Sequence, residues 1–295
     1  MTRRRFSLML GAAPVVGAAS AASSTEASAV PLQVRTLSFN LRYQNDSDTG
    51  PKHWTARRGP VIDLIRREAA DCVGLQEALR SQLDDLHERL GGDYAEIGVG
   101  REDGKTRGEY SALLIRRDRW VVEESGTFWL SDTPDVPNSM SWGNRITRIC
   151  TWARLKETES GRKLHFFNTH FDHQSQPSRE KSAALLAERI AAREPAAPFV
   201  VTGDFNATPD NSAITSLTGE PMKLVDAWAA ANPDVPAAES GTWQAFNGNR
   251  DGGRIDFVLV PPGTRVLDAA ILHDAPGGVL PSDHFPVRAT VEFGS

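Results

Sequence analysis

Short β-type runs recur along almost the whole chain and constrain its fold more than any other feature. Each run is rich in Val, Ile, Phe, Leu and Thr and is bounded by Gly, Pro, Asp or Asn, as the strands of a packed sheet are. They occupy residues 33–39, 72–76, 112–116, 149–155, 164–169, 199–202, 255–260 and 287–293. No internal repeat and no long Gly/Ser or Pro linker separates them. The runs therefore favour one domain built on β-sheets.

Three segments between groups of strands have helical patterns. Residues 60–70 and 81–90 repeat apolar side chains at helical spacing, and the second stops at a pair of glycines. Residues 178–193 place Ser178 as the expected N-cap and end before Pro195. Strands outnumber helices, and the helices lie between the strands in sequence. The pattern predicts an α/β fold in which two mixed β-sheets pack face to face and are flanked by helices.

The first residues are typical of an export signal. Three consecutive arginines beginning at Arg3 precede a small, mostly apolar stretch that is too short to span a membrane comfortably, and an A-x-A cleavage candidate ends at Ala29. The basic start is similar to a twin-arginine signal, which exports folded proteins. We expect residues 1–29 to be this signal and residues 30–295 to form a single domain. The mature protein would be periplasmic or secreted and would have no transmembrane segment.

Charge and cysteine content narrow the function further. The chain has 33 basic and 38 acidic residues, a formal net charge of −5, and loss of the signal would make it more acidic. A protein of this charge has no general attraction to phosphate backbones, so no specific DNA-binding partner is expected. Cys72 and Cys150 lie in apolar runs and predict buried free thiols rather than a disulfide. A monomer is expected.

Polar residues stand at the ends of several β-type runs, where any one alone would be read as a solvated turn residue. In a mixed sandwich, the carboxyl end of one strand lies beside the amino end of its antiparallel neighbour, so such residues can share one rim. Carboxylates, amides and histidines, almost without cysteine, suit Mg²⁺ or Mn²⁺. The number and order of these residues therefore favour a site. In chain order they are Asn40, Glu77, His170, Asp172, Asp204, Asn206, Asp256, Asp283 and His284.

The motifs that contain these residues resemble the endonuclease/exonuclease/phosphatase superfamily, which includes DNase I-like nucleases. They occur in the order of that family: Ser38-Phe39-Asn40, Leu75-Gln76-Glu77, Asn168-Thr169-His170, Gly203-Asp204-Phe205-Asn206, Arg254-Ile255-Asp256 and Ser282-Asp283-His284. The resemblance implies a four-layer α/β sandwich and divalent-metal-dependent hydrolysis of phosphoesters. Other segments are similar to an exported bacterial branch whose substrates are poorly defined: residues 98–104, 108–110, 126–131, 151–155 and 168–173.

The resemblance also implies how a metal would be held. Glu77 would be the main ligand of Mg²⁺ or Mn²⁺, with Asn40 beside it. Asp283 would add a contact through water. These three residues supply only oxygen donors, in keeping with a hard divalent cation.

The same resemblance implies a reaction by in-line attack of water on phosphorus. Asp204 and Asn206 would face the phosphate, and Asp204 would orient or deprotonate the water. Asp256 would hold one nitrogen of His284 and raise its basicity. His170 would hydrogen-bond the phosphate or protonate the leaving oxygen. Whether Asp204 or His284 is the base is left open by the sequence.

Loops, rather than the rim, are expected to select the substrate. Arginine is suited to forked recognition of a second phosphate or a carboxylate, although about half of the candidates should make structural ion pairs instead. The candidates are Arg101, Arg107, Glu109, Tyr110, Trp142, Arg145, Arg148, Asp172 and Arg179.

Several functions remain compatible with these residues. The leading prediction is a phosphodiesterase or phosphatase acting on a small-molecule or polymer phosphoester outside the cytoplasm. The alternatives are a nuclease that degrades extracellular DNA or RNA and a non-catalytic ligand-binding protein on the same fold. Abasic-site endonucleases of the family carry Asp two residues after the first Asn, where this chain has Arg42, so DNA repair is disfavoured. A retaining glycosidase would need two carboxylates about 5 Å apart and would leave the two histidines unexplained.

Overall fold

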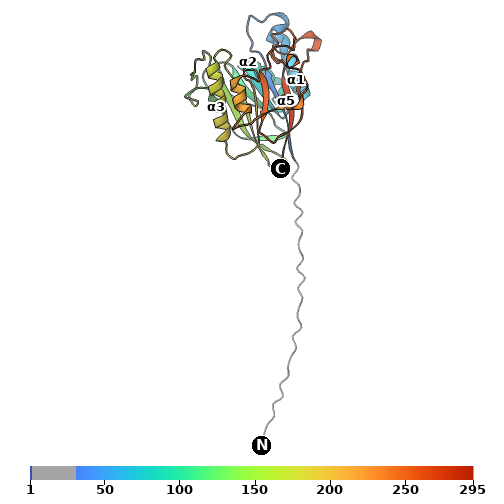
Figure 1. The fold of residues 1–295 in the computed structure, drawn as a ribbon. Helices are drawn as coiled ribbons and strands as arrows, with labels where there is room; N and C mark the ends of the chain where they lie inside the picture. Colours follow the sequence, from blue (N-terminus) through green and yellow to red (C-terminus); the bar gives the residue numbers. More distant parts are fainter. Residues whose placement is uncertain (2–30, 295) are drawn as a thin grey trace. The chain divides into compact units, whose positions relative to one another are not determined.

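The computed structural model describes Met1 and residues 31–294, so the predicted export signal lies outside the described residues except for Met1. The α-helices are α1 (Trp54–Glu68), α2 (Arg80–Leu90), α3 (Gln176–Ala191), α4 (Ser212–Thr218) and α5 (Ala227–Ala231) (Figure 1). The strands are β1 (Leu32–Asn40), β2 (Cys72–Ala78), β3 (Tyr94–Ile97), β4 (Tyr110–Arg116), β5 (Trp120–Trp129), β6 (Ile149–Glu157), β7 (Lys163–His170), β8 (Phe199–Asp204), β9 (Val225–Asp226), β10 (Asp256–Val260), β11 (Arg265–Ile271) and β12 (Val287–Phe293). Short 3-10 turns lie at Gly50–Lys52, Ala237–Glu239 and Pro276–Gly278.

The strands form two mixed six-stranded sheets, as the pattern of runs predicts. The first sheet has the order β11-β12-β1-β2-β4-β3, and the second has the order β5-β6-β7-β8-β10-β9. Every run predicted from the sequence lies in a strand. The four strands without a predicted run, β3, β5, β9 and β11, are the edges of the two sheets. Edge strands leave much of their length exposed, as β5 and β11 do here, so they lack the continuous apolar signature of central strands.

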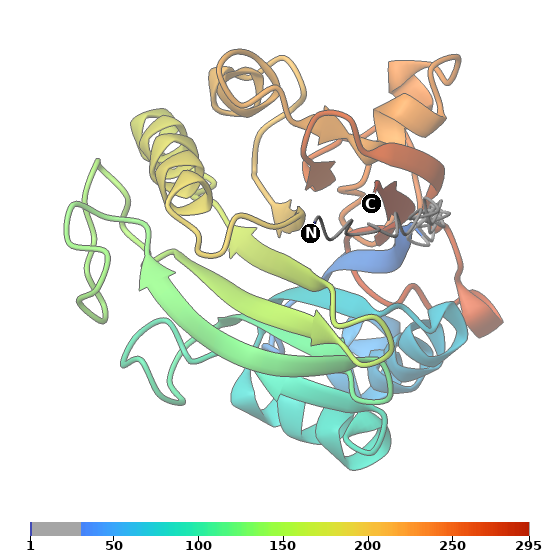
Figure 2. The same ribbon diagram turned by 90° about the horizontal axis from the view of Figure 1, so that it is seen from below.

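Helices cover the outer faces of the sheets and complete four layers (Figure 2). Helices α1 and α2 pack on the first sheet through residues such as Ile65 and Leu83, whereas α3 and α4 pack on the second through Leu186 and Ile214. A third apolar cluster, which includes Phe166, fills the space between the sheets. Burying one such side chain stabilises the fold by about 1.5–3 kcal/mol relative to leaving it exposed. The predicted fold class is therefore confirmed.

Two helix starts differ from the sequence prediction. Helix α1 begins at Trp54 with His53 as its N-cap, so Pro60 lies inside the helix rather than at its start. Helix α3 begins at Gln176, and its N-cap is Ser175, whose hydroxyl accepts from the Ser178 N–H at 3.2 Å. The prediction of Ser178 as the cap is wrong. Pro177 misled it, because proline is tolerated within the first turn as well as before a helix.

The two sheets approach closely where β2 passes β7 and β8. A Cβ on Gly74 would lie 2.0 Å from Thr202 Oγ1 and 2.6 Å from Asn168 Oδ1, so only glycine fits there. Asn168, from the second sheet, donates to the carbonyl of Leu75 at 2.8 Å and to that of Ala112 at 3.0 Å in the first. The asparagine of the Asn168-Thr169-His170 motif is therefore a buried residue whose side chain hydrogen-bonds one sheet to the other.

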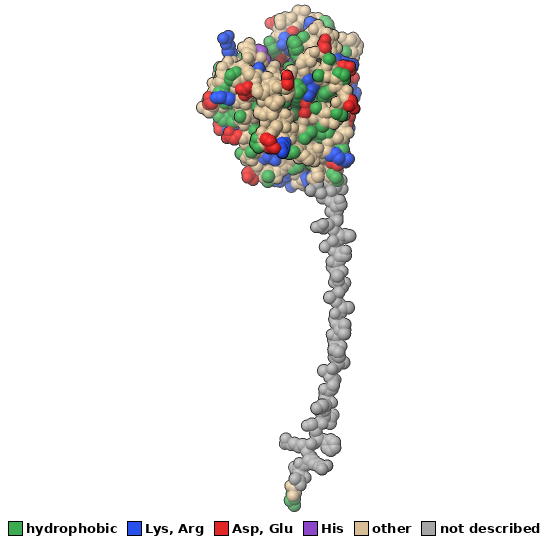
Figure 3. All heavy atoms as spheres, in the orientation of Figure 1, with side chains coloured by type: hydrophobic (Ala, Val, Ile, Leu, Met, Phe, Trp, Pro, Cys, Tyr) green, Lys and Arg blue, Asp and Glu red, His purple; other side chains and the backbone are tan. Residues whose placement is uncertain are grey.

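Cys72 and Cys150 are buried free thiols in different sheets, as predicted. Within residues 31–294, no helix is both long and apolar enough to cross a membrane. On the face of the molecule seen in Figure 3, acidic and basic side chains are interspersed.

Candidate active site

Strand register brings the predicted polar residues of the second sheet together. His170, the last residue of β7, lies opposite Asp204, the last residue of β8, in a parallel pair. Asp204 lies in turn opposite Asp256, the first residue of β10, in an antiparallel pair. The carboxyl ends of β7 and β8 therefore meet the amino end of β10 at one edge of the sheet. This is the arrangement that the prediction of a shared rim requires.

The first sheet contributes residues to the same site with unusual backbone geometry. Asn40 lies opposite Gln76 at the parallel ends of β1 and β2, one residue before Glu77. Glu77 lies where the β2–β4 register shifts, and its φ is +60°. Arg42 and Asn206 also have left-handed backbone, with φ of +56° and +47°. Such conformations cost about 1–3 kcal/mol each in a non-glycine residue and concentrate at functional sites.

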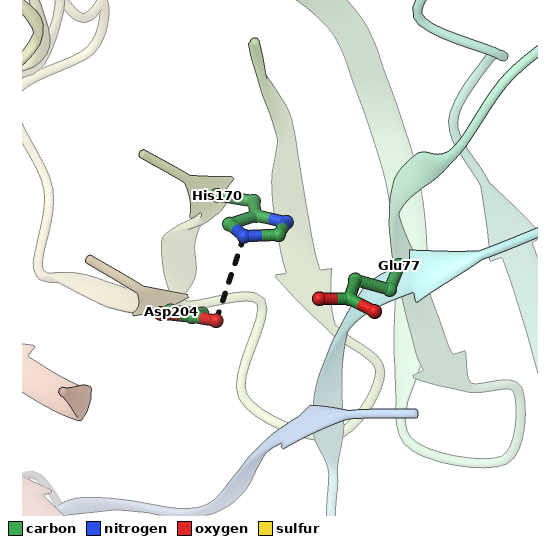
Figure 4. Close-up of side chains that lie close together, drawn as sticks. All are labelled: Glu77, His170 and Asp204. Carbon is green, nitrogen blue, oxygen red and sulfur yellow. Dashed lines mark ion pairs between the residues drawn. The ribbon is translucent and has the colours of Figure 1, made fainter. Parts of the chain in front are cut away.

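These residues line a cleft of about 730 Å³. Figure 4 shows Glu77, from the first sheet, facing His170 and Asp204 from the second. The cleft is bordered on all sides by charged, polar and aromatic groups. Its lining is Arg42, Tyr43, Glu77, Arg101, Glu109, Ile146, Arg148, His170, His173, Asp204, Asn206, Trp243, Ile255, Asp283 and His284.

His284 is a charged donor on one side of the cleft. Its Nδ1 lies 2.8 Å from Asp256 Oδ2, and since a carboxylate accepts, Nδ1 carries a proton. Its Nε2 lies 3.8 Å from Asp204 Oδ2. Burial alone would lower the pKa of His284, but the carboxylates of Asp256 and Asp204 outweigh burial and raise this pKa well above its ordinary value. The predicted Asp256–His284 pair is therefore present in the structure.

His170 has the opposite electrostatic surroundings. Its Nε2 is 3.0 Å from Asn206 Nδ2, and because an amide nitrogen only donates, this Nε2 is an unprotonated acceptor. Its Nδ1 is 3.9 Å from Glu109 Oε2. Burial, followed by the charges of Arg148 and Arg101, lowers the pKa of His170 well below its ordinary value. His170 is thus neutral.

Asp204 lies between the two histidines. Its Oδ2 is 3.5 Å from His170 Nε2 and accepts a hydrogen bond from Asn40 Nδ2 at 2.9 Å. Its Oδ1 accepts from the Asn206 N–H at 2.9 Å. Burial and then the nearby Asp256 carboxylate raise the pKa of Asp204 to about 7. A carboxyl with this pKa can exchange a proton near neutral pH.

The donor set suits a hard divalent cation. Glu77, His170 and Asp204 each offer a ligand atom, and these atoms lie within 4.8 Å of one another. Each Glu77 oxygen accepts only one hydrogen bond, from Asn40 Nδ2 and from the Tyr43 N–H, both at 3.1 Å. Lone pairs on both oxygens therefore remain for a cation.

Asn40, which is predicted to lie beside the metal, contacts both carboxylates of the site. Its Oδ1 accepts the Arg42 N–H at 2.9 Å, so its amide nitrogen faces Glu77 and Asp204. In this arrangement Asn40 holds the two carboxylates in position. Asp283 lines the cleft, with Oδ2 3.9 Å from Arg42 Nε.

Three of the predicted substrate-binding residues line the cleft: Arg101, Glu109 and Arg148. Arg101 donates two hydrogen bonds of 2.7 Å to the carboxylate of Glu109. The other six predicted residues are absent from the cleft lining: Arg107, Tyr110, Trp142, Arg145, Asp172 and Arg179. These side chains contact local partners or solvent instead, and their part in substrate binding stays a prediction.

In the structure, four of these six residues make local hydrogen bonds and two are exposed. Tyr110 donates to a backbone carbonyl, and Trp142 Nε1 donates to Asp132 at 2.7 Å. Asp172 Oδ1 accepts two backbone N–H groups, and Arg179 Nη1 donates to the Asp172 carbonyl. Arg107 and Arg145 are exposed.

The sequence analysis did not single out several residues that line the cleft. His173 belongs to the same segment as His170, and its Nδ1 accepts from Arg148 Nη2 at 2.9 Å. Trp243 lines the cleft with 47% of its surface exposed. Its exposed face was not visible from sequence, because Trp is buried in most contexts.

Two packed mixed sheets with polar residues gathered at one rim define a DNase I-like fold. The chain belongs to the Endonuclease/Exonuclease/phosphatase family, whose model matches residues 37–284. It is similar to an endonuclease/exonuclease/phosphatase from Bacteroides vulgatus, with 37% identity, a TM-score of 0.83, and coverage of 89% of this chain and 99% of that chain. It is also similar to a mannosyl-6-phosphatase from Bacteroides thetaiotaomicron, with 35% identity, a TM-score of 0.80, and coverage of 88% and 99%.

A relative from Acanthamoeba polyphaga mimivirus, protein L388, is 31% identical over 160 residues. The match covers 52% of this chain and 59% of the viral protein. This chain therefore spans little more than half the length of that relative.

Proposed function

We propose that this protein is a divalent-metal-dependent phosphoester hydrolase that acts by in-line attack of water. One observation carries the proposal: Asp204, a carboxyl that can accept a proton, and His284, a protonated imidazole, lie 3.8 Å apart in a cleft that Glu77 also lines. The gathering of carboxylates and histidines at one edge of the sheets supports an enzyme over a non-catalytic binding protein.

In the proposed reaction, the side chains divide the proton transfers between them. Asp204 accepts a proton from the attacking water, and the pKa of about 7 suits it to this task near neutral pH. His284 donates hydrogen bonds to the phosphoryl group and gives a proton to the leaving oxygen. The proton on Asp204 then returns to His284, which restores both groups. Neutral His170 and Asn206 position the phosphate.

Glu77, with Asn40 beside it and Asp283 contributing through water, would hold Mg²⁺ or Mn²⁺. When bound, the cation would neutralise charge on the phosphoryl oxygens. Activity on p-nitrophenyl phosphate or its bis-ester should vanish after dialysis against EDTA and return with Mg²⁺ or Mn²⁺. Glu77→Gln should weaken metal binding, measured by calorimetry, and lower the rate by about 10²-fold. Full activity after exhaustive chelation would overturn the metal assignment.

The likeness to the mannosyl-6-phosphatase supports sugar phosphates as the first substrates to test. A panel of sugar phosphates, single- and double-stranded DNA, RNA and sphingomyelin, each with and without Mg²⁺, separates a phosphatase from a nuclease and a lipid phosphodiesterase.

We also propose that the protein acts outside the cytoplasm, because its first residues match an export signal. Replacing Arg3 and Arg4 together by Lys should leave the precursor in the cytoplasm. Fractionation and immunoblotting would show this, and normal secretion of the double variant would refute the twin-arginine route without touching the enzymatic proposal.

A further inference from the structure

Arg148 is a buried guanidinium whose hydrogen-bonding capacity is largely unused. It precedes β6 and is only 3% exposed, yet it lines the cleft beyond His170. Its Nη2 contacts His173 at 2.9 Å, while its Nε and Nη1 have no hydrogen-bond partner among the residues that the structure describes. Burying charged donors without partners is unfavourable, so such a group in a cleft wall indicates an anion that completes it.

The carboxylates around Arg148 are already engaged elsewhere. Both oxygens of Glu109 accept from Arg101. Asp172 Oδ1 accepts backbone N–H groups, and its Oδ2 stays 3.8 Å from Arg148 Nε, beyond hydrogen-bonding distance. Burial and the neighbouring charge of Arg101 lower the pKa of Arg148. Arg148 is thus held beside a second cation, Arg101. Among the described residues, no carboxylate is hydrogen-bonded to Arg148.

Four residues, Arg101, Glu109, Arg148 and His170, line the cleft and also border a narrow space next to it. This space is further bounded by Tyr110, Ser111 and Ile149 and has no room for a water molecule. Around Arg148 the described residues therefore leave no second cavity for an additional group.

We propose that Arg148, supported by Arg101, binds the terminal oxygens of the reacting phosphate and makes the enzyme selective for phosphomonoesters over phosphodiesters. This inference rests on the proposed phosphoester hydrolysis at the same site. A monoester carries two negative charges near neutral pH, and the forked donors of arginine match its oxygens. A diester has one charge fewer and one terminal oxygen fewer to accept hydrogen bonds from these donors.

The test compares p-nitrophenyl phosphate with methyl p-nitrophenyl phosphate, which have the same leaving group. The wild type should have a higher kcat/KM for the monoester. Arg148→Gln should lower kcat/KM for the monoester by about 10²-fold and change the diester value only a few-fold. Arg148→Lys should recover part of the loss. Arg66→Gln and Arg89→Gln, which change exposed arginines of α1 and α2 outside the cleft lining, are the matched controls.

Calorimetry separates this inference from the proposed function. Orthophosphate should bind the chelated wild type more tightly than dimethyl phosphate does, and Arg148→Gln should weaken orthophosphate binding by at least 10-fold. If the wild type hydrolyses neither ester, the proposed function fails while the binding test still stands. The Arg148 proposal is overturned by equal losses on both esters, by a wild type that prefers the diester, or by unchanged orthophosphate affinity. Circular dichroism and melting of each variant check the fold, and the two-ligand comparison on the wild type needs no variant.

Discussion

The two sides of the cleft each place a carboxylate near a histidine, yet one histidine is positively charged and the other is neutral. Asp256 lies 2.8 Å from His284 Nδ1, and Asp204 adds a second negative group 3.8 Å from Nε2. Glu109 lies 3.9 Å from His170 Nδ1 but is itself bound by Arg101. The pKa of His284 is raised and that of His170 is lowered.

The difference shows that a neighbouring carboxylate does not by itself decide the charge of a histidine. Burial favours the neutral form of both rings. Among the described residues, the charges that act most strongly on His284 are carboxylates, whereas Arg148 and Arg101 offset Glu109 on the His170 side. One side of the cleft is therefore arranged to donate protons and the other to bind an anion while its histidine stays neutral.

Replacing the protonated histidine or the carboxylate that holds it should give the largest loss of activity. We expect His284→Ala to lower kcat by about 10³-fold and Asp256→Asn by nearly as much, because the carboxylate sustains the imidazolium. The double variant should be little slower than the slower single one, since the two residues act as a unit. Steady-state kinetics on one chromogenic ester measures all three. His87→Ala, on the exposed face of α2, is the control. Multiplicative losses would mean independent roles.

Replacing each histidine by a neutral glutamine tests the difference between the two sides further, with a smaller expected loss of activity. Glutamine keeps hydrogen-bonding groups but cannot carry a charge, so it should serve better for His170 than for His284. His170→Gln should lose only about 10-fold in kcat/KM, whereas His284→Gln should be as impaired as His284→Ala. Profiles from pH 5 to 9 should keep their shape in His170→Gln. A large loss with an altered profile would show that His170 is protonated during the reaction.

The smallest effect concerns stability and Asp204, which lies between the two sides. Its pKa is about 7 in the folded protein, above the ordinary 3.8. A carboxyl with a raised folded pKa contributes stability below its unfolded pKa, and this contribution is lost as pH rises through the folded value. Asp204→Asn should therefore melt higher than the wild type at pH 8 without metal, by a few °C, and the difference should shrink toward pH 5. Thermal melts in EDTA measure it, and a pH-independent difference would contradict the raised pKa.

The rim could be predicted from sequence because its signal is local. Asn40, Glu77 and Asp204 each follow an apolar strand, and the register of mixed sheets then brings them to one edge. The edge strands could not be predicted in the same way, because their exposed positions carry little apolar pattern. The pattern also placed the start of α3 at Ser178 rather than at Gln176.

The charges of the site depend on distant pairings that no local pattern reveals. Arg148 and Arg179 look alike in sequence as candidates for anion binding. Only the fold shows that Arg179 donates to Gln176 and to a backbone carbonyl, whereas Arg148 is buried with free donors. The opposite states of His170 and His284 arise in the same way, from residues far apart along the chain.

The close approach at Gly74 has a consequence for assembly. Glu77 lies three residues after this glycine in β2. The side chains that contact the glycine position are those of Asn168 and Thr202. His170 lies two residues after Asn168, and Asp204 lies two residues after Thr202. The distance between the two sheets at Gly74 therefore sets the distance between the reacting groups across the cleft. A chain that has formed only one sheet lacks the reacting groups of the other, so hydrolysis would report that both sheets have docked at the correct separation.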